Sequence, residues 1–415
     1  MLTLLTSAAT ACLVVATPPT IQGNVTFHPP VPLGEARWGV TMFAAFNHSA
    51  HAIQMPAAMQ VTLDGGATYT KQPMLGRVVP VVSNLVPGPS GPHDFGNISA
   101  HQSGPGPWTS LASATSTTWR LDAKGTLSTV TSSKAVTFSG LPVPIHCDPS
   151  YSTCAIRLQG SGIVAFGDGS LLQSAIVFYN GVPKFPRATS VVVFRSTDGG
   201  FDWRYQGCIA NATDYAFSQE GPNEHDLTML DFGQVMAVVR LDAGDGLASH
   251  PYAPYYFTVS QDGGRTWPKM QPMPGTGCAR PRLLQLGDGY APLLMSGGRM
   301  KFNGNGSASD DNLLWISWQG VKFPALEPTG PTGWEMYALS YYHNLLAGPG
   351  TPRFTSAVND TNAGAETAAY TALIQTGKCS AVVLYDLSRK STGRQGFSMR
   401  IDIHLDEGGE AGIHC

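Results

Sequence analysis

The chain has 415 residues, 42% of them apolar, which is enough to bury one large core or two ordinary ones. Only 13% of the residues are charged, the formal net charge is −3 and no long basic run occurs, so a nucleic-acid partner has no electrostatic support. The 47 glycines and 31 prolines are typical of an all-β protein with many short strands and turns, rather than of a helical one.

The first element is an apolar stretch, MLTLLTSAATACLVVA, which ends in a small-residue cleavage site after Ala16. We expect residues 1–16 to be a signal peptide; no Lys or Arg precedes the apolar run, so a core strand is the alternative. No later segment reaches the length of a transmembrane helix. N-x-S/T sequons begin at Asn24, Asn47, Asn97, Asn211, Asn305 and Asn359. Together these features predict a secreted, N-glycosylated protein.

Removal of the leader would take Cys12 with it and leave an even number of cysteines, which permits disulfides in a secreted chain. These are Cys147, Cys154, Cys208, Cys278, Cys379 and Cys415. A Cys147–Cys154 bond would close a short loop, and the other pairings stay open. No Cys/His group has the spacing of zinc ligands, so we expect neither a metal nor a cofactor.

One short pattern occurs three times along the chain: TLDGGATY at 62–69, STDGGFDW at 196–203 and SQDGGRTW at 260–267. The first spacing between copies is close to twice the second, which fits a unit of roughly 55–65 residues with one unit lacking the pattern. D-G-G between apolar strands predicts a tight turn, because glycine accepts positive φ. The aspartates, Asp64, Asp198 and Asp262, can accept bonds from the amides of their own turns. We expect their role to be structural.

Apolar or alternating strands precede each copy, and hairpins with a glycine in the turn lie upstream of the later two. NLLWISWQGVKF fits the same place in a further unit, with Gln319 where the aspartate would be. We predict six units, at about 25–72, 75–145, 150–205, 208–270, 278–325 and 335–415. The predicted fold is therefore all-β, a six-bladed β-propeller that forms a single domain over residues 17–415.

The repeated pattern resembles the Asp-box of sialidases and other propellers, where it lies on the face away from the active site. NEHDLTMLDFGQVMAVVR (223–240) resembles the fourth blade of sialidases, in which a Glu assists the nucleophile and an Arg at the end of the next strand binds the substrate carboxylate. This resemblance implies those roles for Glu224 and Arg240. Taken without the resemblance, Glu224 is an ordinary loop carboxylate and Arg240 its surface partner.

ETAAYTALIQTGKCSAVVLYD (366–386) resembles the sixth blade of sialidases, whose nucleophile is a tyrosine, and implies that role for Tyr370. The alternative is an ordinary strand tyrosine. Sialic acid carries a carboxylate on its anomeric carbon and would repel an anionic nucleophile, whereas a neutral phenol avoids that repulsion. With a pKa near 10, the phenol needs a carboxylate to take its proton.

The first blade departs from the sialidase pattern, in which an arginine in an R-I-P motif is followed by an aspartic acid. No such motif occurs here, and Gln54 stands in the nearest echo, HAIQMP. Arg37 is a substitute in the right blade. No Asp or Glu lies between Arg37 and Asp64, which leaves His48 and His51 as possible acids or surface residues.

The third substrate arginine of the family is also displaced. Arg299 is our candidate, and Arg280 and Arg282 in CARPRLL compete for the same role. The segment AFGDGS resembles the R-I-P blade of sialidases in its residue pattern, which would make Asp168 the acid. Asp168 lies in the third blade, however, and we do not assign it that role.

The resemblance implies a secreted exo-α-sialidase-like glycoside hydrolase that acts on sialylated or other anionic glycans. Tyr370 would attack with Glu224 as base, and Arg240 would bind the carboxylate with Arg299 or Arg37. A lectin or adhesin that has lost the acid and the first arginine is one alternative. A glycosidase for another anionic sugar is the other.

Overall fold

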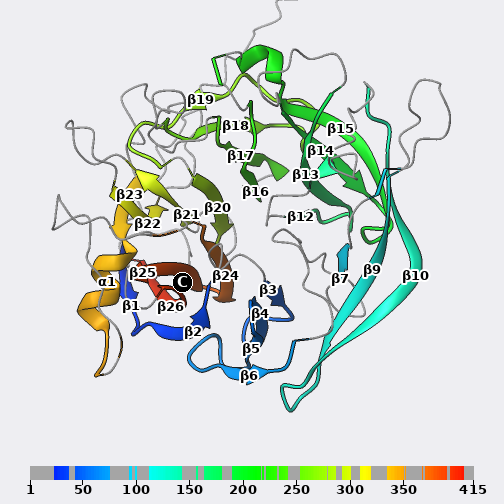
Figure 1. Cartoon of the computed structure of the whole chain (residues 1–415). Coiled ribbons are helices and arrows are strands. Elements are labelled where there is room, and N and C mark those ends of the chain that lie inside the picture. Colours follow the sequence, from blue (N-terminus) through cyan, green and yellow to red (C-terminus); the bar gives the residue numbers. More distant parts are fainter. Residues whose placement is uncertain are drawn as a thin grey trace, which may run out of the picture.

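The computed structural model of the chain is an all-β ring of sheets around a central axis (Figure 1). It describes residues 23–36, 43–74, 93–95, 99–100, 112–142, 156–157, 163–179, 189–215, 217–218, 221–230, 233–241, 253–277, 279–286, 292–300, 309–318, 334–349, 351, 367, 370–389 and 393–405. The predicted leader, residues 1–16, lies outside these ranges.

Three of the sheets are four-stranded, antiparallel and built from consecutive strands. The first contains β3 (Phe43–Ala45), β4 (His51–Met55), β5 (Ala58–Thr62) and β6 (Thr70–Gln72). The second contains β16 (His225–Met229), β17 (Val235–Val239), β18 (Tyr256–Ser260) and β19 (Gln271–Pro272). The third contains β20 (Ala279–Gln285), β21 (Leu293–Met300), β22 (Ser309–Ser317) and β23 (Trp334–Ala338). β3, β16 and β20 are the strands of these sheets that lie nearest the centre of the ring (Figure 1).

A nine-stranded sheet accounts for the difference between the predicted six blades and the five sheets observed. It contains β7 (His93–Phe95), β8 (Ser99–Ala100), β9 (Ala112–Leu121), β10 (Leu127–Ser139), β11 (Ile156–Arg157), β12 (Val164–Ala165), β13 (Leu171–Val177), β14 (Ser190–Ser196) and β15 (Asp202–Ala210). Antiparallel pairs dominate on both sides, but β10 and β15 are joined by a short parallel register from Thr137↔Asp202 to Ser139↔Arg204. This pairing merges into one sheet the two units that the sequence predicts as separate blades.

The fifth sheet closes the ring by pairing the two ends of the described chain. It contains β24 (Ala372–Gly377), β25 (Ser380–Arg389) and β26 (Gly393–Leu405), joined by β1 (Gly23–Phe27) and β2 (Val31–Glu35), which both pair with β26. An antiparallel register runs from Gly23↔Leu405 to Phe27↔Ile401. β26 is thereby paired along both of its sides, and the early strands β1 and β2 form the edge of this sheet.

The middle strands are buried on both faces, because each sheet packs against a neighbour on either side. β17, VMAVV, has no exposed residue, and neither has β13, LLQSAIV. One core cluster joins Val191 and Val193 of β14 to Leu227 of β16 and Ala237 of β17, across the interface of two sheets. The continuous apolar runs of the sequence are therefore strands between two sheets rather than surface strands.

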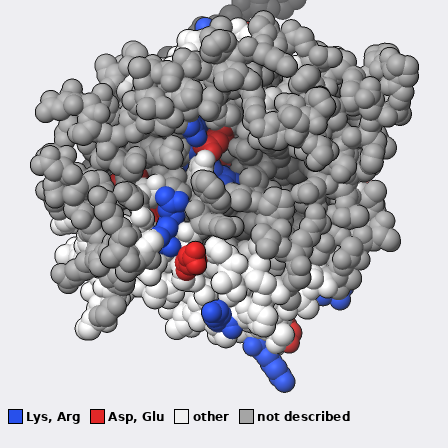
Figure 2. Space-filling model, in the orientation of Figure 1, with Lys and Arg blue, Asp and Glu red and all other residues white. Residues whose placement is uncertain are grey.

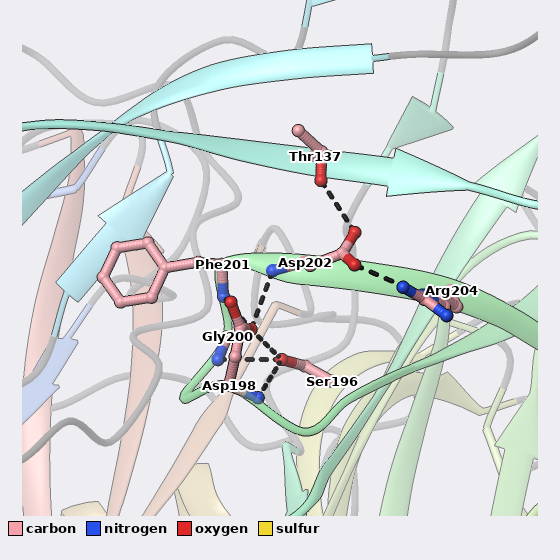
Figure 3. A network of polar contacts seen from close by, with 7 residues as sticks. All are labelled: Thr137, Ser196, Asp198, Gly200, Phe201, Asp202 and Arg204. Atoms are coloured by element: carbon pink, nitrogen blue, oxygen red, sulfur yellow. Dashed lines mark hydrogen bonds and ion pairs between the residues drawn. The ribbon is translucent and has the colours of Figure 1, made fainter.

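The D-G-G repeats form the same hydrogen-bonded turn at all three positions, each between the third and fourth strand of a four-stranded run. In the third copy the Ser260 hydroxyl donates to Asp262 Oδ1 at 2.7 Å, and Thr266 donates its amide to Oδ1 and its hydroxyl to Oδ2. Figure 3 shows the second copy, where Asp198 accepts from the amides of Phe201 and Asp202. Gly263 and Gly264 have φ values of 70° and 89°, which glycine adopts without strain.

Little helix accompanies the strands in the described residues: the 3-10 helix η1 (Ala212–Tyr215) and α1 (Leu339–Leu346). No helix among the described residues is long and apolar enough to cross a membrane. Cys379 is disulfide-bonded, while Cys208 is a free thiol in β15. Cys147 and Cys154, whose bond the sequence suggests, lie outside the described residues.

Replacement of Asp262 tests whether the repeated aspartate is structural. Burial raises the pKa of Asp262, but hydrogen bonds from Thr266 and Ser260 outweigh it and lower the pKa to about 2. We expect Asp262→Ala to lower the free energy of unfolding at pH 7 by about 1 kcal/mol, since the carboxylate is partly exposed to solvent. Denaturant unfolding measures the change. Asp214→Ala, at an exposed position in η1, is the control and should change it by less than about 0.5 kcal/mol; equal effects would contradict a structural role.

Candidate active site

Glu224 and Arg240 meet because they flank one hairpin. Glu224 precedes β16 and Arg240 follows β17. His225, the first residue of β16, pairs with Val239, the last residue of β17. The Arg240 amide donates to the Glu224 carbonyl at 2.7 Å, which continues the ladder by one residue. Their side chains form an ion pair, Arg240 Nη1 to Glu224 Oε2 at 2.6 Å, with 8% and 13% of the respective side-chain areas exposed.

Tyr370 reaches the same carboxylate from the last sheet. It lies just before β24, and its hydroxyl donates to Glu224 Oε1 at 2.6 Å. The next residue fixes this segment: the Thr371 hydroxyl bonds Ser296 Oγ of β21 at 2.7 Å, and Arg282 Nε of β20 donates to the Thr371 carbonyl at 3.3 Å. Tyr370 is therefore held in place by the sheet of β20–β23 and the sheet of β24–β26. It faces the carboxylate of Glu224, which belongs to the sheet of β16–β19.

Arg280, at the start of β20, contacts both members of this pair. Its main-chain amide donates to Glu224 Oε2 at 3.0 Å, and its guanidinium carbon lies 5.5 Å from the centroid of the Tyr370 ring. The residue is 4% exposed. Arg280 was one of two competing arginines in the sequence, and the amide contact could not have been inferred there.

A second, deeper layer lies beneath these residues. Arg282, 1% exposed, and Asp226, fully buried, belong to β20 and β16. Asp226 Oδ2 accepts the amide of Leu283 at 2.9 Å, which ties the two inner strands together. His225 beside them is fully buried, and burial lowers its pKa to about 4, so it is neutral at neutral pH.

The surrounding charges decide where the proton of the Tyr370–Glu224 pair resides. Burial raises the pKa of Glu224, but the charge of Arg240 and the bonds from Tyr370 and Arg240 outweigh it and bring the pKa to about 2. The charge of Glu224, together with burial, raises the pKa of the Tyr370 phenol well above its usual value. Glu224 is therefore a carboxylate and Tyr370 a neutral phenol at neutral pH.

Positive charge predominates among the described groups of this site. Arg240, Arg280 and Arg282 bring three guanidinium groups against the two carboxylates Glu224 and Asp226. Burial and the charge of Arg280 lower the pKa of Arg282 to about 9, so it is still protonated at neutral pH. Figure 2 shows basic and acidic groups side by side in a recess near the centre of this face. Excess buried positive charge favours an anionic ligand.

The repeated turns lie at the opposite end of the strands. Val235 of β17 pairs with Ser260, next to the Asp262 turn, whereas Arg240 follows the far end of β17. At that turn end a cavity of about 550 Å³ lies on the axis. It is lined by residues near the C-terminal ends of the inner strands, among them Met229, Gln285 and Gln375. The site and the turns thus occupy the two ends of the ring.

Both histidines considered as acids in the first blade lie at the turn end. His51 pairs with Thr62 beside the Asp64 turn and is fully buried. Its Nε2 atom is hydrogen-bonded to the Tyr69 hydroxyl at 2.8 Å. His48 is exposed and lines the cavity of the turn end. Neither can protonate a leaving group beside Glu224, because the tight β3–β4 turn directs both to the other end of the strands.

Asp168 also lies at the turn end, which agrees with leaving it out of the site. It occupies the β12–β13 turn, where its carboxylate accepts bonds from Ser170 and pairs with Arg195 at 3.2 Å. Of the remaining arginine candidates, Arg37 lies outside the described residues, and Arg299 belongs to β21 with a side chain outside the described set. Gln54, the residue in place of the family's arginine, lies within β4.

The chain is similar to several solved structures, of which one is similar enough to support the fold. A protein of unknown function from Dyadobacter fermentans matches with a TM-score of 0.51 and 15% identity over 93% of this chain and 100% of that one. A Hadza microbial sialidase matches with a TM-score of 0.48 and 14% identity, over 90% of this chain and 65% of that one. An α-L-arabinofuranosidase of Fusarium graminearum matches with a TM-score of 0.48 and 10% identity, over 90% of this chain and 97% of that one. No protein-family model and no curated protein matches the sequence.

Because the identities are this low, the first match shows a common fold and no activity. The function has to be inferred from the residues that meet at Glu224.

Neutralising Glu224 tests the electrostatics of the site. Glu224→Gln leaves Arg240 buried without its counter-charge, and we expect the free energy of unfolding at pH 7 to fall by about 3 kcal/mol. The pKa of Glu224 is lowered from 4.5 to about 2, so its stabilising effect is complete above pH 4.5 and disappears as the pH falls towards 2. The difference between wild type and variant should therefore shrink across that window.

Denaturant unfolding at several pH values measures this difference. Glu35→Gln, at an exposed position of β2, is the control and should show no such pH-dependent difference. A Glu224→Gln difference that is constant from pH 7 to pH 3 would contradict the charge state assigned to Glu224.

Proposed function

We propose that this protein is a secreted, retaining glycoside hydrolase of the exo-α-sialidase type, with β7–β10 and β11–β15 counted as separate blades of a six-bladed propeller. The observation that carries the proposal is the 2.6 Å hydrogen bond from the Tyr370 hydroxyl to Glu224 Oε1, with Arg240 on the other carboxylate oxygen. A phenol bonded to a buried carboxylate, beside arginines, is the arrangement that a tyrosine nucleophile requires.

The proposed reaction has two steps. The Tyr370 proton moves to Glu224 Oε1 as Oη attacks the anomeric carbon, the glycosidic bond breaks, and the departing oxygen takes up a proton from solvent water. Water then attacks the same carbon and releases one proton to solvent, the bond to Tyr370 breaks, and the phenol regains its proton from Glu224. Two displacements at one carbon retain the anomeric configuration.

Charge supports an anionic sugar as the substrate. A carboxylate on the anomeric carbon would be repelled by an anionic nucleophile but not by the neutral Tyr370 phenol. The guanidinium of Arg240 offers bidentate, permanently charged donors to such a carboxylate. The excess of arginines over carboxylates among the described groups of the site favours the same class of ligand.

A terminal sialic acid is the substrate we favour, since the segments around Glu224, Arg240 and Tyr370 resemble those of sialidases. The first blade departs from the sialidase pattern, and neither His48 nor His51 can act as its acid. Two other functions are therefore tested as well: hydrolysis of another anionic sugar, and binding without turnover. An activated aryl glycoside is the substrate of choice, because its leaving group departs without help from an acid.

Tyr370→Phe removes only the proposed nucleophilic oxygen. We expect hydrolysis of a fluorogenic aryl sialoside to fall by at least about 100-fold in kcat/KM, with the melting temperature little changed. Tyr341→Phe, at an exposed tyrosine of α1, is the control and should leave the rate unchanged.

Three outcomes separate the candidate functions. Turnover of a uronic-acid glycoside in place of the sialoside would assign another anionic sugar. Sialoside binding on a glycan array without turnover of the aryl sialoside would assign a binding module. Turnover that survives Tyr370→Phe would contradict the proposed nucleophile.

A further inference from the structure

Arg280 has an unusual backbone for its residue type. Its φ is +27°, and among the described residues it is the one non-glycine residue with positive φ. A side chain larger than glycine is strained in that region, and strain of this kind persists where the surrounding structure requires it, often at functional sites. The question is what the conformation provides.

The conformation lets one residue reach both members of the Tyr370–Glu224 pair. The main-chain amide of Arg280 donates to Glu224 Oε2 at 3.0 Å, while the guanidinium lies over the face of the Tyr370 ring at 5.5 Å. The residue is 4% exposed, so its charge acts on the ring with little screening by solvent. A guanidinium over an aromatic face is attracted by the ring, and more strongly when the ring bears a negative charge.

We propose that Arg280 is a positioning residue for the nucleophile, whose guanidinium stabilises the Tyr370 phenolate while its main-chain amide holds Glu224 in place to receive the proton. This role goes beyond the family resemblance and rests on the proposed function in taking Tyr370 as the nucleophile. In the step concerned, the O–H bond of Tyr370 breaks and an O–H bond forms at Glu224 Oε1. Negative charge thereby moves from Glu224 towards the ring that Arg280 covers.

The charges of Arg240 and Arg280 act on both members of the pair, but Arg240 pairs directly with Glu224, whereas the Arg280 guanidinium lies over the Tyr370 ring. An anionic substrate group that attracts Arg240 weakens its pairing with Glu224 and leaves the Arg280 guanidinium over the ring. Arg280 therefore differs from a substrate clamp: it acts on Tyr370 and stays with it through both steps.

The described charged groups that face Tyr370 are few enough for a clean measurement. They are Glu224 and Arg240 from the β16–β17 hairpin and Arg280 from β20, with Arg282 one layer deeper. Among them, the Arg280 side chain can be removed without loss of a direct hydrogen bond to Glu224, because that bond comes from its main chain. A unit charge at 5.5 Å shifts a pKa by about one to two units in a partly buried site.

The test places 3,5-difluorotyrosine at position 370 and follows its ring-fluorine NMR resonance with pH. Fluorination lowers the pKa of the phenol and makes its ionisation visible among the other tyrosines. We expect Arg280→Gly to raise the midpoint by about one to two pH units in a protein that still folds, because glycine accepts φ of +27°. Arg280→Lys, which keeps the charge, should restore part of the shift.

Two further variants control for structural effects. Arg280→Asn, a second neutral residue that tolerates positive φ, should raise the midpoint as Arg280→Gly does. Arg204→Gln, at an exposed arginine of β15, should leave it unchanged. A midpoint unchanged in folded Arg280→Gly or Arg280→Asn would overturn the proposal.

The readout needs no substrate, so the two proposals fail separately. A raised midpoint in a protein that turns over no glycoside supports the role of Arg280 and counts against the hydrolase. Turnover that depends on Tyr370 but not on the charge at position 280 supports the hydrolase and counts against Arg280.

Discussion

A buried carboxylate is the constraint on which the site depends. Glu224 has little access to water, and its charge is tolerable only because donors from separate sheets surround it. Arg240 comes from the same hairpin, the Arg280 amide from the next sheet, and Tyr370 from the sheet that also contains the N-terminal strands. Closure of the ring therefore brings together the groups that keep Glu224 ionised and hydrogen-bonded to Tyr370.

The two ends of the strands have different tasks. At the turn end, aspartates bind the amides of their own loops, and the energy of those bonds goes into fixing the strand connections. At the other end, the corresponding hydrogen-bonding capacity of Glu224 is directed at groups from distant parts of the chain.

Local features of the sequence were predictable, and features set by contacts between sheets were not. The D-G-G turns predicted the propeller, and the resemblance of residues 223–240 to a sialidase blade selected Glu224 and Arg240, which flank one hairpin in the structure. The parallel β10–β15 pairing, which reduces six expected blades to five sheets, arises between segments far apart in sequence and has no local signal. The same holds for the main-chain contact between Arg280 and Glu224, which lie 56 residues apart in the sequence.

The central claim is that Tyr370 forms a covalent bond with an anionic sugar. Incubation with an activated, ring-fluorinated sialosyl fluoride, followed by peptide mass spectrometry, tests it most directly, because fluorination slows the second displacement and allows the intermediate to accumulate. We expect one added sugar on the peptide that contains Tyr370, attached to that residue. A sugar attached to Glu224 or elsewhere, or continued turnover with no attached sugar, would contradict it.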